Sequence, residues 1–271
     1  MKSTNISLSD KTNIHKTEWL VAEANAHLLL VHGYAEHSGR YDHFAKFLNT
    51  KEISVTSFDQ RGYGKSDGLK GYIDRFSTYI SDLNEIRAHI KAPVFLMGHS
   101  MGGLIATQYI QSHNDNQIKG LISSSSLLEI DPKLSPLLQA LAPILGFLFP
   151  KLQTEKLDKT YITRDPKELE KYMNDPLMYL GGTRARTGAE MLKAIQEARL
   201  GFNKINLPLL ALHGDADRLT MPGGTKKLHA DASSADKTLK IYPELYHELL
   251  NEPEKEMIMS DIASWILERS N

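Results

Sequence analysis

The chain of 271 residues contains no cysteine. Disulfide bonds, thiolate metal sites and cysteine nucleophiles are therefore excluded. It also lacks an excess of charge of either sign, because 32 Lys and Arg residues stand against 33 Asp and Glu residues, which gives a net charge of −1. Without a basic surplus or a long run of like charge, the composition predicts no nucleic-acid partner.

A secretory signal is a third missing feature. Residues 1–26, MKSTNISLSDKTNIHKTEWLVAEANA, have no continuous apolar stretch of the kind that such a signal requires. We therefore expect a cytoplasmic protein. Its length and its 41% hydrophobic residues are sufficient for one large core with an inserted subdomain.

What the sequence does contain is a series of short apolar runs separated by helical patterns. The runs predict strands over 27–33, 53–59, 94–98, 118–124, 207–214 and 238–243. Several are apolar throughout, as expected of strands that are covered on both faces in a parallel sheet. Residues 17–22 are predicted to form an antiparallel edge strand.

Helical periodicity is found over 76–90, 101–113, 222–232 and 253–268. Strands that alternate with helices predict a doubly wound α/β fold, with a mostly parallel central sheet and helices on both faces. The alternation stops for more than eighty residues before the strand at 207–214. We therefore predict a core formed by 1–126 and 202–271, and an inserted helical cap at 127–201.

The most informative motif lies where the strand at 94–98 turns into the helix at 101–113. Gly98-His99-Ser100-Met101-Gly102 fits G-x-S-x-G, the nucleophile elbow. Such a turn strains the serine backbone, so its neighbours must be small for the strand and the helix to approach each other. The turn exposes the Ser100 hydroxyl at a helix N-terminus, where the Met101 N–H and the helix dipole can stabilise an oxyanion.

A serine nucleophile needs a base, and the base needs a group that orients it. In this class of fold the chain order is serine, acid, histidine. Asp215 and Asp217 both follow the strand at 207–214, and we choose Asp217 because Asp215 suits a local turn. His247 follows the last strand and is the predicted base.

The loop after the first central strand also predicts a role in catalysis. His32-Gly33 ends that strand, Gly33 permits close approach, and the Tyr34 N–H is the predicted second oxyanion donor. The histidines at 32, 37 and 43 have no metal-ligand spacing. We expect His32 to be a hydrogen-bonded structural residue and His43 to lie at the surface.

Five stretches together resemble one family. They are HGYAEHSGRYDHFAKFL, SFDQRGYGKSDG, GHSMGG, HGDADRLT and YHELLNEPE. As a set they resemble the monoacylglycerol lipase and lysophospholipase group of the α/β-hydrolases, from about residue 17 to residue 268.

The resemblance implies an α/β-hydrolase fold and a serine hydrolase that cleaves monoglyceride esters without a cofactor or a metal. It implies a catalytic triad of Ser100, Asp217 and His247 and oxyanion donors at Tyr34 and Met101. A pocket for the glycerol hydroxyls would lie at Glu36 and Arg40, with Tyr172 of the cap nearby. The alternatives are an exposed ion pair for Glu36 and Arg40, and a packing role for Tyr172.

The cap carries a further signal. Residues 134–150, LSPLLQALAPILGFLFP, contain no charged residue, but three prolines and one glycine make them unsuited to span a bilayer. They are either a buried helical hairpin or an apolar lid over an acyl-chain tunnel, and we favour the lid. A partly exposed lid of this kind would also make transient contact with a membrane or micelle.

Other functions remain open at this stage. A lysophospholipase, a broad carboxylesterase or a thioesterase would use the same triad. Dehalogenases and epoxide hydrolases of this fold place aspartate at the elbow, so Ser100 excludes their chemistry. A non-enzymatic binding module would be expected to lack a member of the triad, and here all three are present. The oligomeric state is not predicted.

Overall fold

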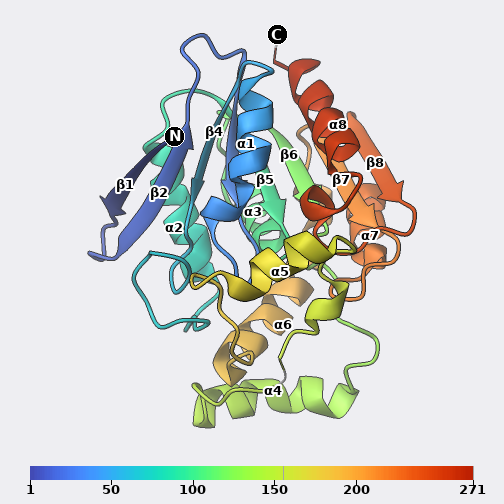
Figure 1. Ribbon diagram of the computed structural model, residues 1–271. Helices are drawn as coiled ribbons and strands as arrows, with labels where there is room; N and C mark the ends of the chain where they lie inside the picture. The colour runs from blue at the N-terminus through green and yellow to red at the C-terminus, as the bar shows by residue number, and fades with distance from the viewer. Residues whose placement is uncertain (155, 271) are drawn as a thin grey trace.

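A computed structural model describes residues 1–154 and 156–270 of the protein (Figure 1). Its centre is an eight-stranded sheet in the order β1-β2-β4-β3-β5-β6-β7-β8. The strands are β1 (Lys2–Ser7), β2 (Asn13–Trp19), β3 (Ala26–Val31), β4 (Ile53–Phe58), β5 (Val94–His99), β6 (Ile118–Ser124), β7 (Leu209–Gly214) and β8 (Lys237–Tyr242). Strands β3 to β8 pair in parallel, whereas β2 runs antiparallel to both β1 and β4.

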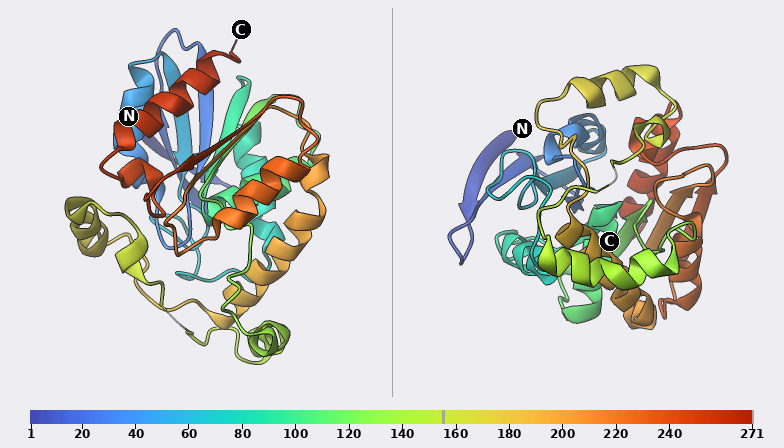
Figure 2. Two further views of the ribbon diagram at one scale, coloured as in Figure 1. Left: turned by 90° about the vertical axis from the view of Figure 1, so that its right-hand side faces the viewer. Right: turned by 90° about the horizontal axis from the view of Figure 1, so that it is seen from below.

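Helices cover both faces of the sheet, because alternate side chains of each central strand point to opposite faces. Leu28 and Leu30 of β3 pack with α1 (Asp42–Asn49) and α8 (Lys255–Leu267). Leu29 and Val31 belong to the opposite core, which includes side chains of α2 (Ser77–Ala88), α3 (Met101–Ser112) and α7 (Pro222–Asp231). Figure 2 shows these two layers on either side of the sheet. The predicted α/β fold is confirmed.

The segment between β6 and β7, where the cap is expected, is helical. It contains α4 (Pro136–Leu148), a 3-10 turn η2 (Lys159–Tyr161), α5 (Pro166–Asn174) and α6 (Ala185–Leu200). These elements lie together below the sheet in Figure 1, beside the end from which β5 leads into α3. Within the described residues, no helix is both long enough and apolar enough to cross a membrane.

The structure corrects the sequence prediction in two places. Strand β2 is antiparallel, as expected, but it is not an edge strand, because β1 pairs with its outer side. Strand β1 is polar and largely exposed, so its sequence KSTNIS has no apolar run that would predict a strand. In the cap, residues 136–148 form one helix that continues through Pro143, which excludes the less favoured alternative of a helical hairpin.

Candidate active site

Ser100 lies at the turn between β5 and α3 with φ = 53° and ψ = −120°. A residue other than glycine rarely adopts this conformation, and such strain is found mainly at functional sites. The neighbouring glycines allow it: a Cβ atom on Gly98 would overlap the Gly102 carbonyl, and one on Gly102 would overlap the Val31 carbonyl. The local sequence therefore forces β5, α3 and β3 together around the Ser100 hydroxyl.

The acid and the histidine predicted from the sequence meet beside this turn. His247 Nδ1 lies 2.7 Å from Asp217 Oδ2, and both residues are buried. Asp215 is exposed, and its carboxylate accepts the Glu244 N–H at 2.6 Å. The structure thus places Asp217 against His247, and Asp215 in a local turn interaction.

Asp217 has further partners that the sequence did not reveal. Its Oδ1 accepts the backbone N–H groups of Leu219 (2.7 Å) and Thr220 (3.1 Å). Its Oδ2 also contacts the Thr220 hydroxyl (2.8 Å) and His213 Nε2 (3.1 Å). Burial alone would raise the pKa of Asp217, but the neighbouring His247 and His213, with their hydrogen bonds to its carboxylate, hold that pKa well below its usual range. Asp217 is therefore a fixed anion.

The contact with Asp217 also changes the pKa of His247. Burial alone would lower the pKa of His247, but the Asp217 carboxylate raises it above the ordinary value. Its ring packs 4.7 Å from that of His99, centroid to centroid. Burial, together with the neighbouring His247, lowers the pKa of His99 to about 4, so His99 is neutral at pH 7. His247 is thus the member of this pair that is disposed to accept a proton.

Ser100 and His247 line one pocket of about 150 Å³. Both residues are described, and no hydrogen bond joins the Ser100 hydroxyl to the His247 ring. In enzymes without substrate such bonds are often long, and they tighten when substrate binds. The three residues of the predicted triad therefore lie at one site.

Of the two predicted oxyanion donors, Tyr34 lines the same pocket, and Met101 directly follows Ser100 at the start of α3. Within the described part of the chain, neither the Tyr34 N–H nor the Met101 N–H has a hydrogen-bond acceptor. The loop carrying Tyr34 touches the nucleophile, because a Cβ atom on Gly33 would lie 3.1 Å from Ser100 Cβ. Two unpaired N–H groups beside a serine are what an oxyanion hole requires.

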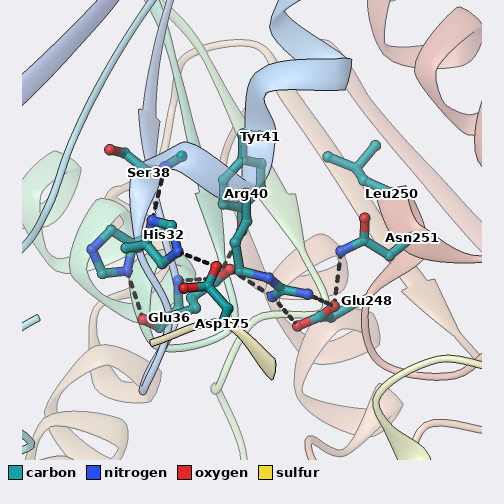
Figure 3. A network of polar contacts seen from close by, with 12 residues as sticks. His32, Glu36, Ser38, Arg40, Tyr41, Asp175, Glu248, Leu250 and Asn251 are labelled. Atoms are coloured by element: carbon teal, nitrogen blue, oxygen red, sulfur yellow. Dashed lines mark hydrogen bonds and ion pairs between the residues drawn. The ribbon is translucent and has the colours of Figure 1, made fainter. Parts of the chain in front are cut away.

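Two of the predicted glycerol-binding residues, Glu36 and Arg40, belong to a buried network of polar contacts, shown in Figure 3. Glu36 and Tyr172 line the pocket of Ser100, together with Glu248, which the sequence analysis missed. Arg40 lies behind them, outside the described lining of that pocket, and pairs with both glutamates. The alternative of an exposed Glu36–Arg40 pair is wrong, because both side chains are at most 10% exposed.

A second cavity, of about 410 Å³, adjoins the first between α4 and α6. Leu138 and Leu145 of α4 face Ala189 and Leu192 of α6 across it. The residues that line both cavities are Leu127, Met191 and Leu219. A small pocket with polar groups therefore shares a wall with an apolar groove beneath α4.

The other histidines of the first loop have structural partners. His32 is buried, with Nε2 accepting the Gln60 N–H at 2.8 Å, so its predicted structural role is confirmed. His43 is only partly exposed, and its Nε2 lies 2.8 Å from the Leu250 carbonyl. Over residues 1–154 and 156–270, no group of three potential ligands is placed to hold a metal ion.

The fold and the strained serine elbow define the protein as an α/β-hydrolase. The family described as serine aminopeptidase, S33, matches residues 22–254. The chain belongs to this family and, within it, to the monoglyceride lipase group of serine hydrolases.

Three similar proteins support this assignment. A monoacylglycerol lipase of Mycolicibacterium smegmatis is 34% identical over 89% of this chain and 87% of its own length. A monoglyceride lipase of Rattus norvegicus is 32% identical over 89% of this chain and 82% of its own length. The crystal structure of the monoacylglycerol lipase of Paleococcus ferrophilus superposes with a TM-score of 0.87 at 30% identity, covering 94% of this chain and 99% of that one.

Proposed function

We propose that the protein hydrolyses monoacylglycerols to fatty acid and glycerol through an acyl-enzyme on Ser100. The observation that carries this proposal is a pair of unlike cavities with a shared wall, the smaller of which is lined by Ser100. The groove under α4 would take the acyl chain, and the small pocket beside Glu36 and Tyr172 would take the glycerol end. Arg40 would contribute to the glycerol end by holding Glu36.

In the proposed reaction, His247 Nε2 takes the proton of the Ser100 hydroxyl as its oxygen bonds to the ester carbonyl carbon. The Tyr34 and Met101 N–H groups stabilise the resulting oxyanion. The ester C–O bond then breaks, and His247, kept in orientation by Asp217, gives its proton to the leaving glycerol. Water repeats the sequence on the acyl-enzyme, which releases the fatty acid and restores Ser100.

The polar end of the pocket favours a neutral headgroup. Glu36 and Glu248 are carboxylates and share the single guanidinium of Arg40, which leaves one net negative charge beside the pocket. A phosphate at that end would be repelled. This charge supports a monoglyceride over a lysophospholipid as the substrate.

A substrate panel tests the proposal. The value of kcat/KM is compared for monoacylglycerols of graded chain length, lysophosphatidylcholine, diacylglycerols, p-nitrophenyl esters and an aminoacyl p-nitroanilide. We expect monoacylglycerols to have the highest value among the natural lipids. A higher value for lysophosphatidylcholine would contradict the headgroup assignment, and a higher value for the anilide would make the protein a peptidase.

The outer surface of α4 supports a second proposal, transient docking on a lipid surface. It carries an apolar patch, the α4 patch, made of Leu137, Ile144, Phe147, Leu148, Phe149 and Leu152, each more than half exposed. Such a patch is unusual on a soluble monomer and suits a membrane or micelle in which the substrate is dissolved. Because the patch itself contains no charge, binding should depend little on ionic strength.

Replacing Leu137 and Phe147 by serine should lower partition onto phosphatidylcholine vesicles by at least about tenfold, since burying one such side chain contributes about 1.5–3 kcal/mol. Co-sedimentation with vesicles measures the effect. Leu200→Ser is the matched control, because Leu200 is 85% exposed at the end of α6, outside the patch. Equal losses in both variants would exclude the α4 patch as the docking surface.

A further inference from the structure

Arg40 is the centre of a buried unit of two carboxylates and one guanidinium. Its Nη1 lies 3.0 Å from Glu36 Oε2 and 2.5 Å from Glu248 Oε1, and its Nη2 lies 2.7 Å from Glu248 Oε2. All three side chains are at most 10% exposed. Buried charges are stable only when their geometry is good and their remaining lone pairs are satisfied, so each further contact of the unit matters.

The Glu36 end of the unit holds the oxyanion loop. Glu36 Oε1 accepts the Gly33 N–H at 2.6 Å and the Tyr41 hydroxyl at 2.7 Å. Gly33 is the residue before Tyr34, and it packs against Ser100. The Glu36 carboxylate therefore fixes the backbone that presents the Tyr34 N–H, with both of its oxygens occupied by protein donors.

The Glu248 end holds the histidine loop. Glu248 directly follows His247, and its Oε2 also accepts the Asn251 amide at 2.8 Å. The Glu248 N–H donates to the Ile162 carbonyl of the cap at 2.8 Å. Arg40 thus joins two loops that are 208 residues apart in the chain, as Figure 3 shows.

The cap closes the unit from a third side. The ring of Tyr172 on α5 lies over the Arg40 guanidinium, 4.9 Å from its carbon to the ring centroid. The N–H groups of a guanidinium lie in its plane, and this cation–π contact covers one of the two faces, which carry no donors. The N–H groups of Arg40 named above donate to the carboxylates of Glu36 and Glu248. The guanidinium is therefore better placed to fix these two side chains than to bind a substrate hydroxyl.

We infer that Arg40 and Glu248 are positioning residues, which keep the oxyanion loop and His247 at a fixed separation and place one net negative charge beside the histidine. The inference rests on the proposed function, in which His247 is the base. Within the described residues, the charged and titratable groups that face His247 include Asp217, His99, Glu36 and Glu248. After Asp217, the two glutamates contribute to the raised pKa of His247.

The positioning role of the Arg40 guanidinium can be tested with Arg40→Lys. Lysine keeps the charge but cannot bond two carboxylates in the planar arrangement of a guanidinium. A displacement of about 1 Å in a catalytic group can lower the rate by about 10²-fold. We expect kcat to fall by about this factor for monoacylglycerol and for p-nitrophenyl acetate alike, with KM nearly unchanged. The short ester is decisive because it has no glycerol for Arg40 to bind.

Two further measurements make the test independent of folding. Arg61→Lys is the matched control. The Arg61 guanidinium also donates two hydrogen bonds to a buried carboxylate, that of Asp82, which lies away from the site. Glu248→Gln keeps the shape but removes the charge, so the acidic limb of the kcat/KM profile should move to lower pH. Thermal midpoints of all variants are compared with that of the unmodified protein.

The outcomes separate this inference from the proposed function. If Arg40→Lys raises KM for monoacylglycerol but leaves p-nitrophenyl acetate hydrolysis unchanged, Arg40 binds substrate and the inference is overturned. An unchanged acidic limb in Glu248→Gln would overturn the electrostatic part. If the unmodified protein reacts with fluorophosphonate at Ser100 but does not hydrolyse monoacylglycerols, the substrate proposal fails, while the short ester still tests positioning.

Discussion

Replacing Ser100 by alanine is expected to lower kcat by about 10⁶-fold, because removal of a serine nucleophile costs about this much in enzymes with a full triad. Rates are measured with a p-nitrophenyl ester, whose product is detected at low turnover. The variant should also lose covalent labelling by a fluorophosphonate, which reacts only with an activated serine. Its fold should persist, since alanine removes one oxygen that makes no hydrogen bond to His247.

The matched control is Ser112→Ala, at the exposed C-terminal end of the same helix α3. This variant should keep both labelling and turnover. Residual turnover above about 1% in Ser100→Ala, or labelling that persists there, would mean that another group is the nucleophile. Loss of activity in both variants would indicate damage to α3 and not to a catalytic group.

Much of the sheet could be predicted because its strands are strongly apolar. The strand predicted at 118–124 is observed with the same bounds, and the one predicted at 53–59 ends at Phe58. Strand β1 was missed because it is polar and buries little, so its pairing with β2 depends on backbone hydrogen bonds that leave no hydrophobic pattern. For the same reason β2 was placed at the edge.

Part of the candidate site could likewise be predicted from the sequence, and part could not. Ser100, Asp217 and His247 each follow a strand, and the ends of parallel strands meet at one edge, so their meeting could be anticipated. The contacts of Arg40 with its partners could not be anticipated from the sequence. Glu248 had a visible signal, its position next to His247, but its fork with Arg40 depends on how two distant loops fold over each other. The contact of His213 with Asp217, four residues later in the chain, also gave no signal in the sequence.

Asp217→Asn should lower kcat by about 10⁴-fold, and the reason lies in the hydrogen bonds of the carboxylate. Oδ1 accepts two backbone N–H groups, from Leu219 and Thr220, which cannot reverse their polarity. The asparagine oxygen must therefore occupy that position, and its NH₂ group then faces His247 Nδ1. His247 would accept at Nδ1 and carry its proton on Nε2, where it cannot take the proton of Ser100.

Asp215→Asn is the control for this prediction. Asp215 is exposed and accepts one backbone N–H, from Glu244, which an asparagine oxygen can also accept. Its kcat should stay within about twofold of the unmodified protein, as expected of a surface change away from the site. The residual activity of Asp217→Asn should also extend to lower pH, because the carboxylate that raises the pKa of His247 is gone. Similar losses in the two variants, or a larger loss at 215, would show that the Asp217–His247 contact is not the one that orients the base.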